Sequence, residues 1–153
     1  MAGFQRILLA TDFSETAAAA TDLALVIART FHASLDVLHV LETDIPNMTD
    51  GVVYIPPNYY KEVEKQAAEK LEGVIPRADR DTLSVTLAMR EGAPFVEIIR
   101  YAREQQMDLI VLGTHGRGAI AHVIMGSVAE RVVRKATCPV LTVRHPAHQF
   151  TMP

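Results

Sequence analysis

The sequence predicts one α/β domain built on an open, five-stranded parallel sheet with helices on both faces. The length of 153 residues matches a single domain, and an apolar share of 49% is enough for a substantial core without disulfides or metals. Short apolar runs alternate along the chain with longer segments of helical composition, in the order β-α-β-α-β-α-β-α-β. This alternation is typical of a parallel sheet whose crossover helices pack on both of its faces.

Three elements are predicted near the N-terminus. A short apolar run from Arg6 to Asp12 predicts a strand that is buried on both faces. Ser14 is the expected N-cap of a helix from Thr16 to Phe31, and a second strand follows from Leu35 to Val40. Large apolar residues recur in the helix at every fourth position, and they predict the face that lies against the sheet: Leu23, Ile27 and Phe31.

The middle of the chain begins with a polar, proline-bearing passage from Glu42 to Asn58, which we expect to be a mobile surface loop. Helical composition returns from Tyr59 to Ile75, and Pro76 is expected to end that helix. A strand from Leu83 to Met89 and a helix from Pro94 to Gln105 follow. The residues expected to face inward are Val63, Ala67, Leu71 and Val74 in the former helix and Val96, Ile99 and Ala102 in the latter.

Two further apolar runs, from Leu109 to Leu112 and from Pro139 to Val143, complete the predicted sheet. Between them lies a glycine-bearing loop that leads into a helix from about Ser127. In open parallel sheets, ligands bind beyond the carboxyl ends of the strands, where the strand order reverses. Because Asp12 ends the first strand and Gly113 follows the fourth, a binding site is expected beside these two residues.

The charge, the apolar pattern and the cysteine content exclude several classes of protein. A net charge of -3 leaves no general excess of positive charge for a nucleic-acid backbone or an anionic membrane surface. No apolar run reaches the length of a membrane span, and Asp12 comes too early for the apolar core of a signal peptide. The single cysteine, Cys138, fits a reducing cytosol and is expected to be a buried, inert thiol. We therefore expect a cytoplasmic protein without nucleic-acid or membrane partners.

The segment from Gly113 to Ser127 carries the clearest chemical signal. It contains half of the 8 glycines of the chain. Glycine allows the backbone to approach a ligand closely, so that successive amides converge on phosphate oxygens. The free amides and the positive dipole end of the helix that starts near Ser127 also favour an anion, and the Ser127 hydroxyl adds a donor. The four glycines concerned are Gly113, Gly116, Gly118 and Gly126.

Of three alternative roles for these glycines, the sequence leaves two open and excludes one. A simple turn between a strand and a helix needs only one or two glycines, and it stays open as an alternative. A P-loop is excluded, because Ala119 stands where that motif needs a lysine. The dinucleotide pattern G-x-G-x-x-A fits Gly116, Gly118 and Ala121, but it belongs after a first strand and needs an acid where Cys138 stands. It remains an alternative.

The glycine segment resembles that of the universal stress protein family, whose ATP-binding members carry the pattern G-x2-G-x9-G-[ST] between the fourth and fifth strands. Gly113, Gly116, Gly126 and Ser127 match every fixed position of this pattern. The start of the chain, RILLATDFSE, and its end, GSVAERVVRKATCPVLTV, are similar to the family too. The resemblance implies a nucleotide-binding domain over residues 1–146, a tail over 147–153, and the strand order 3-2-1-4-5 of a Rossmann-like, adenine nucleotide alpha hydrolase-like fold.

The resemblance also implies which residues hold the nucleotide. Asp12 and the backbone around Ala10 would contact the adenine and the ribose, and Val40 would contact the adenine. The glycines and the start of the last helix would hold the phosphates. The full expected set is Ala10, Thr11, Asp12, Val40, Leu112, Gly113, His115, Gly116, Arg117, Gly118, Gly126, Ser127 and Val128.

Several polar side chains have a second interpretation. Asp12 also suits the N-cap of the first helix. His115 and His122 are seven residues apart without a nearby carboxylate or cysteine, which argues against a zinc site. Arg117 either pairs with phosphate or stays exposed on its loop. No residue is assigned a catalytic role, because Ser14 has no local histidine partner and is expected to cap the helix.

ATP accompanied by Mg²⁺ is the expected cofactor, and the expected function is regulation in a stress response. The last strand, PVLTV, has no successor to cover it, so its edge is expected to pair with the same strand of a second copy in a homodimer. The resemblance implies the same dimer. Two alternatives stay open. One is an enzyme that slowly hydrolyses ATP or transfers its phosphoryl or nucleotidyl group at the same site, and the other is a dimeric interaction module without nucleotide.

Overall fold

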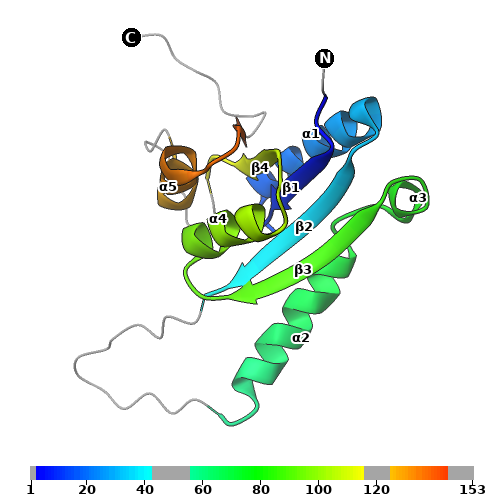
Figure 1. Ribbon diagram of the computed structural model, residues 1–153. Helices are drawn as coiled ribbons and strands as arrows, with labels where there is room; N and C mark the ends of the chain where they lie inside the picture. The colour runs from blue at the N-terminus through cyan, green and yellow to red at the C-terminus, as the bar shows by residue number, and fades with distance from the viewer. Residues whose placement is uncertain (1–2, 43–55, 116–124, 145–153) are drawn as a thin grey trace, which may run out of the picture.

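Five parallel strands form one sheet in the order β3-β2-β1-β4-β5, which confirms the predicted topology (Figure 1). The computed structural model describes residues 3–42, 56–115 and 125–144. Neighbouring strands are parallel throughout, and the strand order reverses between β1 and β4. The strands are β1 (Arg6–Ala10), β2 (Ser34–Leu41), β3 (Val85–Glu91), β4 (Leu109–Gly113) and β5 (Val140–Val143).

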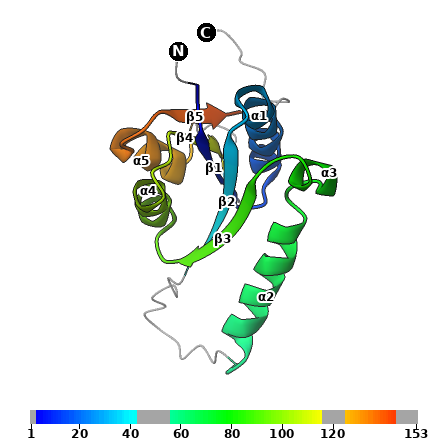
Figure 2. The same ribbon diagram turned by 45° about the vertical axis from the view of Figure 1, so that its right-hand side comes forward.

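Helices cover both faces of this sheet, with α1 and α2 on one face and α4 and α5 on the other (Figures 1 and 2). The second predicted helix ends earlier than expected, at Glu72, where Gly73 is its C-cap. Pro76 does not end that helix; it precedes a one-turn helix, α3, that the sequence pattern did not predict. The helices are α1 (Glu15–Phe31), α2 (Tyr59–Glu72), α3 (Arg77–Arg80), α4 (Pro94–Glu104) and α5 (Ser127–Lys135).

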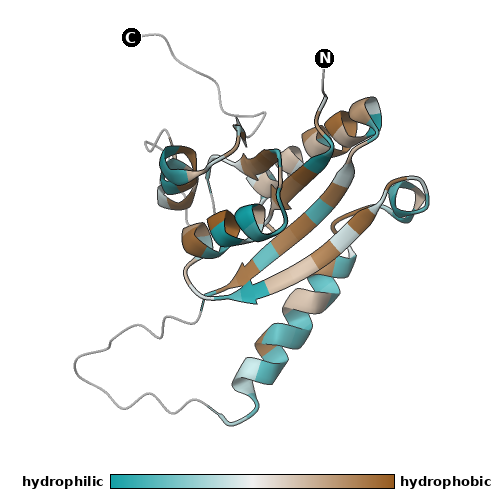
Figure 3. Ribbon diagram, in the orientation of Figure 1, coloured by the Kyte–Doolittle hydropathy of each residue, from teal (hydrophilic) through white to brown (hydrophobic). Residues whose placement is uncertain are grey.

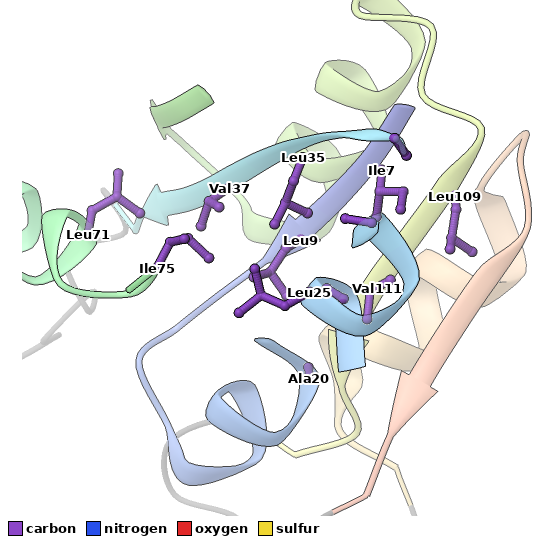
Figure 4. Packing of buried hydrophobic residues seen from close by; sticks show 13 residues of the cluster. Ile7, Leu9, Ala20, Leu25, Leu35, Val37, Leu71, Ile75, Leu109 and Val111 are labelled. Atoms are coloured by element: carbon purple, nitrogen blue, oxygen red, sulfur yellow. The ribbon is translucent and has the colours of Figure 1, made fainter. Parts of the chain in front are cut away.

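The core is divided between the two faces because successive strand residues point in opposite directions. Ile7 and Leu9 of β1 belong to the cluster under α1 and α2 (Figure 4), whereas Leu8 belongs to the cluster under α4 and α5. Both faces of β1 and β4 are therefore buried, and their sequences read as continuous apolar runs. Figure 3 shows the same concentration of hydrophobic residues in the central strands.

Helix α1 faces the sheet mainly through alanines together with Leu25, and of the three large residues that the fourfold spacing predicted only Ile27 packs partly against the core. Ala20, Ala24 and Ala28 are fully buried, whereas Leu23 is 36% exposed and Phe31 is 44% exposed. The prediction was wrong for Leu23 and Phe31 because it assigned the core side of the helix to the largest side chains. Small side chains instead allow the helix axis to come close to β1 and β4, and Leu23 and Phe31 lie on the outer side.

Helix α4 is also rotated relative to the prediction. The structure buries Ile98, Tyr101 and Ala102, whereas Val96 and Ile99 are only half-buried. The reason is a buried polar pair, in which the Tyr101 hydroxyl donates a hydrogen bond of 2.8 Å to the Asp36 carboxylate in β2. Burial, first, and the hydrogen bond to Asp36, second, raise the pKa of Tyr101 to about 12.

Helix α1 packs tightly against the end of β4. A Cβ atom on Gly113 would lie 2.8 Å from Cγ2 of Thr16, 3.0 Å from the carbonyl carbon of Thr16 and 3.1 Å from the amide nitrogen of Ala17. Two of these three atoms belong to the helix backbone and cannot turn away. Gly113 is therefore needed for the packing of α1 on β4.

We expect Gly113→Ala to lower the free energy of unfolding by about 1–3 kcal/mol, because the added methyl group forces the helix away from the strand. Urea denaturation measures this change in the free energy of unfolding. Gly73→Ala is the matched control, since its methyl group would meet only the Lys70 carbonyl at 3.4 Å and is expected to change stability by less than about 1 kcal/mol. Equal effects of the two substitutions would contradict the close-contact argument.

The Asp36–Tyr101 pair predicts how stability depends on alkaline pH. The pKa of Tyr101 is raised from 10.0 to about 12, so the folded state keeps a proton that the unfolded state loses. The contribution of this group is complete below pH 10 and is lost as the pH rises through about 12. Tyr101→Phe removes the hydroxyl. We expect it to lower the free energy of unfolding by about 1–3 kcal/mol at neutral pH, because the buried Asp36 carboxylate loses the hydrogen bond that Tyr101 donates. The stability gap between the two proteins should narrow above pH 10, and a gap that stays constant would contradict the assignment.

Candidate functional site

A cavity of about 860 Å³ lies at the carboxyl edge of the sheet, beside the point where the strand order reverses. The ends of β1, β2 and β4 form its floor, the starts of α1, α4 and α5 form its rim, and one side of α2 forms a wall. The cavity brings together every predicted site residue within the described ranges. These are Ala10, Thr11, Asp12, Val40, Leu112, Gly113, His115, Gly126, Ser127 and Val128.

The chain leaves β1 through a turn that places Asp12 at the cavity. The Asp12 carboxylate accepts a hydrogen bond of 3.0 Å from the Ser14 amide, and Thr11 Oγ1 accepts one of 3.1 Å from the Phe13 amide. The Ser14 hydroxyl accepts a bond of 3.2 Å from the Ala17 amide, so Ser14 is the N-cap of α1, as predicted. The alternative in which Asp12 is the N-cap is therefore wrong.

Two side chains that the sequence analysis did not select connect this turn to β2. His39 is buried, and its Nδ1 lies 2.8 Å from the Thr11 carbonyl oxygen. A carbonyl oxygen only accepts, so Nδ1 carries the proton in this pair. The Phe13 ring packs on the His39 ring with the centroids 4.3 Å apart, while the Phe13 backbone has a φ of 65°. These contacts hold the residue before Asp12 and the residue after it.

The start of α5 presents backbone donors to the same cavity. Gly126 is the N-cap and has no side chain that could cap the helix, and the first helical hydrogen bond runs from the Glu130 amide to the Gly126 carbonyl. The amides of Ser127, Val128 and Ala129 precede that bond, and all three residues line the cavity. Together with the positive end of the helix dipole, they form a place that favours an anion.

Helix α2 closes the side of the cavity opposite α5 and was not predicted to take part. Tyr59, Val63, Gln66 and Lys70 all line the cavity. The Lys70 ammonium lies 5.8 Å from the centroid of the Phe13 ring, which places a cation beside the β1 turn. Val63 is 36% exposed, so its predicted core role is wrong. An apolar residue in helical register gave no signal that it faces a cavity.

Some of the remaining predicted residues lie in the described ranges and some lie outside them. Ala10, Val40 and Leu112 are buried strand residues at the cavity floor. His115 lies two residues after β4, with Nδ1 2.9 Å from Oγ1 of Thr114. Gly116, Arg117 and Gly118 lie outside the described residues, as do His122 and most of the Glu42 to Asn58 loop.

Comparison with known proteins establishes the family. The model of the Universal stress protein family matches residues 3–144, which is nearly the whole chain. The chain belongs to the universal stress protein family. Among the curated relatives of this universal stress protein, YxiE of Bacillus subtilis is 32% identical over 147 residues, covering 92% of this chain and 99% of the relative. MJ0531 of Methanocaldococcus jannaschii is 31% identical over 145 residues, covering 94% of this chain and 84% of the relative.

Solved structures of the family support the same fold. MJ0577, also from Methanocaldococcus jannaschii, superposes with a TM-score of 0.79 at 27% identity and covers 92% of this chain and 96% of that one. A universal stress protein from Burkholderia pseudomallei superposes with a TM-score of 0.70 at 31% identity, over 92% of this chain and 96% of that one. The fold expected from the resemblance is therefore confirmed.

Metal and thiol chemistry find little support within the described ranges of this universal stress protein. No group of three or more His, Cys, Asp or Glu side chains there could hold a metal ion. Cys138 is half-buried, and burial together with the charge of Asp108 raises the pKa of its thiol, which keeps the thiol protonated.

None of the helices in the described ranges is both long enough and apolar enough to cross a membrane.

Proposed function

We propose that this universal stress protein binds ATP in the cavity at the carboxyl edge of its sheet and acts in the cytoplasm as a regulatory protein in a stress response. One observation carries the proposal. The start of α5 has no capping side chain, and it faces the ends of β1, β2 and β4 across one cavity of about 860 Å³. An anion-binding helix start and an apolar strand floor within one space suit a ligand with a phosphate chain at one end and a base at the other.

The two ends of the cavity suit different parts of the nucleotide. Val40 and Ala10 provide an apolar surface for the adenine, and Leu112 continues it toward β4. The Asp12 carboxylate is an acceptor, and it suits the ribose hydroxyls because hydroxyl groups donate. A phosphate beside Asp12 would be repelled, so the phosphate chain is placed toward α5. Thr11 contributes through the backbone that positions Asp12.

The phosphates are assigned to the segment that joins β4 to α5. Gly113 and Gly126 delimit it, and the amides of Ser127 and Val128 donate at its end. In this proposal Gly116, Arg117 and Gly118 contribute further donors, and His115 lies beside them at the end of β4. Lys70 offers a cation from the opposite wall. Mg²⁺ would be held by the phosphate oxygens and by water, as this ion is in many nucleotide sites, so it needs no dedicated cluster of protein ligands.

The choice of ATP rests on the residues of this chain. Two universal stress proteins whose structures were solved in complex with cAMP and with dAMP share the fold at 24% and 20% identity. At that identity the likeness concerns the fold alone. The length of the donor segment argues for a triphosphate, because donors from the end of β4 to the first turn of α5 exceed what a single phosphate can engage. Occupancy would then be signalled through the position of α5.

The decisive variants are Gly126→Asp and Gly126→Asn, which differ only in charge. Gly126 has φ -69° and ψ 156°, a conformation open to any residue, and both side chains are good helix N-caps. Each variant is therefore expected to unfold at the same temperature as the parent, or slightly higher. Saturating ATP with Mg²⁺ should stabilise the parent by about 2.7 kcal/mol at a hundredfold excess over its Kd. The Asp variant should lose that shift, because its carboxylate occupies and repels the phosphate position.

The Asn variant is the control for size. It should retain part of the shift, since its side chain has nearly the same shape without the negative charge. Thermal unfolding with ATP, ADP, AMP and inorganic phosphate measures all of this. An equal thermal shift with ATP in the parent and the Asp variant would mean that the nucleotide binds away from α5. No shift with any adenine nucleotide would overturn the proposal and leave the interaction-module alternative.

We further propose that two copies pair through β5, as the unpaired edge of the sheet. Strand β5 pairs only with β4 among the described strands of the sheet, and all four of its residues are half-buried. The Ile110 amide donates to the Pro139 carbonyl and the Thr114 amide donates to the Val143 carbonyl. Because every second residue of a parallel strand bonds to the same neighbour, the amide of Thr142 points away from β4 and toward a partner strand.

Thr142→Pro tests this homodimer. Proline removes an outward amide and is tolerated on edge strands, so the β4–β5 pairing should survive. Light scattering at micromolar concentration is expected to show a dimer for the parent and a monomer for the variant, with circular dichroism unchanged. Glu91→Pro on the opposite edge strand, β3, is the control. The next amide, that of Gly92, donates to the Leu41 carbonyl of β2, so the Glu91 amide points away from β2, and this variant should remain dimeric. A monomeric parent would contradict the proposal.

A further inference from the structure

A second hollow lies on the outer side of α4 and α5, separate from the nucleotide cavity. It has a volume of about 620 Å³. Its apolar floor consists of Phe95, Val96 and Ile99, which are all half-buried residues of α4. Two of these are the residues whose predicted place in the core was wrong. Of the residues that the structure describes, none lines both this α4–α5 groove and the nucleotide cavity.

The helices that form the groove are basic in a protein that is acidic as a whole. The chain has a net charge of -3, yet α4 and α5 together carry five Arg or Lys residues and three Glu residues. All three glutamates already have a cationic partner. Glu97 pairs with Arg100, Glu130 with Arg134 at 2.9 Å, and Glu104 with Arg90 of β3 at 2.9 Å.

Three cations therefore remain uncompensated around the apolar floor. Within the described ranges, Arg103, Arg131 and Lys135 form no ion pair with a carboxylate. Arg131 lies with its guanidinium carbon 5.0 Å from the centroid of Phe95, and the Lys135 ammonium lies 5.6 Å from it. These cation–π contacts keep two positive charges over the edge of the apolar floor instead of extended into solvent.

We propose that the α4–α5 groove docks an acidic amphipathic helix of a partner protein. An apolar strip edged by cations complements a helix whose apolar residues recur at i, i+3, i+4 and i+7 and are flanked by Asp or Glu. The unpaired cations then meet carboxylates across the interface, which favours this partner over a basic or neutral one and speeds its association.

The apolar floor distinguishes this partner from a nucleic acid. A duplex or single strand is bound mainly through many phosphate contacts or through aromatic stacking platforms. The groove offers three uncompensated cations, and the face of its one aromatic ring, Phe95, is already approached by Arg131 and Lys135. A partner helix instead uses the aliphatic surface of Val96 and Ile99 together with the surrounding charge.

The test uses a fluorescent synthetic helical peptide with leucines on one face and glutamates beside them. Anisotropy should show saturable binding to the full chain that weakens as salt is raised. The same peptide with lysine in place of glutamate, and one with its leucines scrambled around the helix, should bind at least about tenfold more weakly. NMR amide shifts should map the site to α4 and α5.

The chain offers a charge-matched pair of variants. Arg103→Glu with Lys135→Glu reverses the groove and should weaken the acidic peptide at least about tenfold. Arg77→Glu with Lys61→Glu changes the net charge equally, at exposed residues of α3 and α2, and should leave binding unchanged. Ile99→Ser removes apolar surface from the floor and should also weaken binding of the acidic peptide. Thermal unfolding checks that each variant folds.

Four outcomes would overturn the proposal. They are no binding at millimolar peptide, equal binding of the acidic and lysine peptides, equal loss in both double variants, and a single-stranded oligonucleotide that binds the groove in place of the peptide. All of these measurements are made without ATP. Failure here therefore leaves the ATP proposal untouched, and failure of the ATP proposal leaves this one untouched.

Discussion

The packing of α1 against the end of β4 determines the shape of the carboxyl edge. Atoms of the helix backbone stand where a methyl group of Gly113 would lie, and the buried face of the helix is made of alanines. A helix held this close leaves the chain only a short turn after β1. That turn requires the positive φ of Phe13 and is stabilised by the Asp12 and Ser14 side chains. The close packing therefore places Asp12 at the cavity.

The strands could be predicted from the sequence, and the helix faces could not. Strands buried on both sides must be apolar at every position, so β1 and β4 stand out without any knowledge of their neighbours. A helix face depends on which side is offered room. In α1 the sheet accepts Ala24 and turns Leu23 outward, and in α4 the pair of Asp36 and Tyr101 draws polar atoms into the core. Neither choice follows from hydrophobicity along the chain.

The candidate site shows the same division between local and tertiary information. Backbone chemistry is visible in a sequence, because glycine spacing and a helix start reveal where amides can gather, and Gly113, Gly126 and Ser127 do line one cavity. Side chains contributed by distant elements leave no such trace. His39 is one of the few polar residues of a largely apolar strand, and Lys70 is one of three lysines on a charged helix. Only the folded chain brings both of them beside Phe13.

Helices α4 and α5 belong to both hollows of the molecule, at different ends or sides. Pro94 and Ser127, at their first turns, line the cavity at the carboxyl edge of the sheet, while Phe95 and Lys135 line the α4–α5 groove. A ligand in one hollow changes affinity in the other only if it prefers one arrangement of these helices over another. The Tyr101 hydrogen bond to Asp36 ties α4 to β2, whereas α5 meets α4 mainly through side-chain packing and the Arg131 contact with Phe95. Any such preference would therefore act through a shift of α5 against a fixed α4.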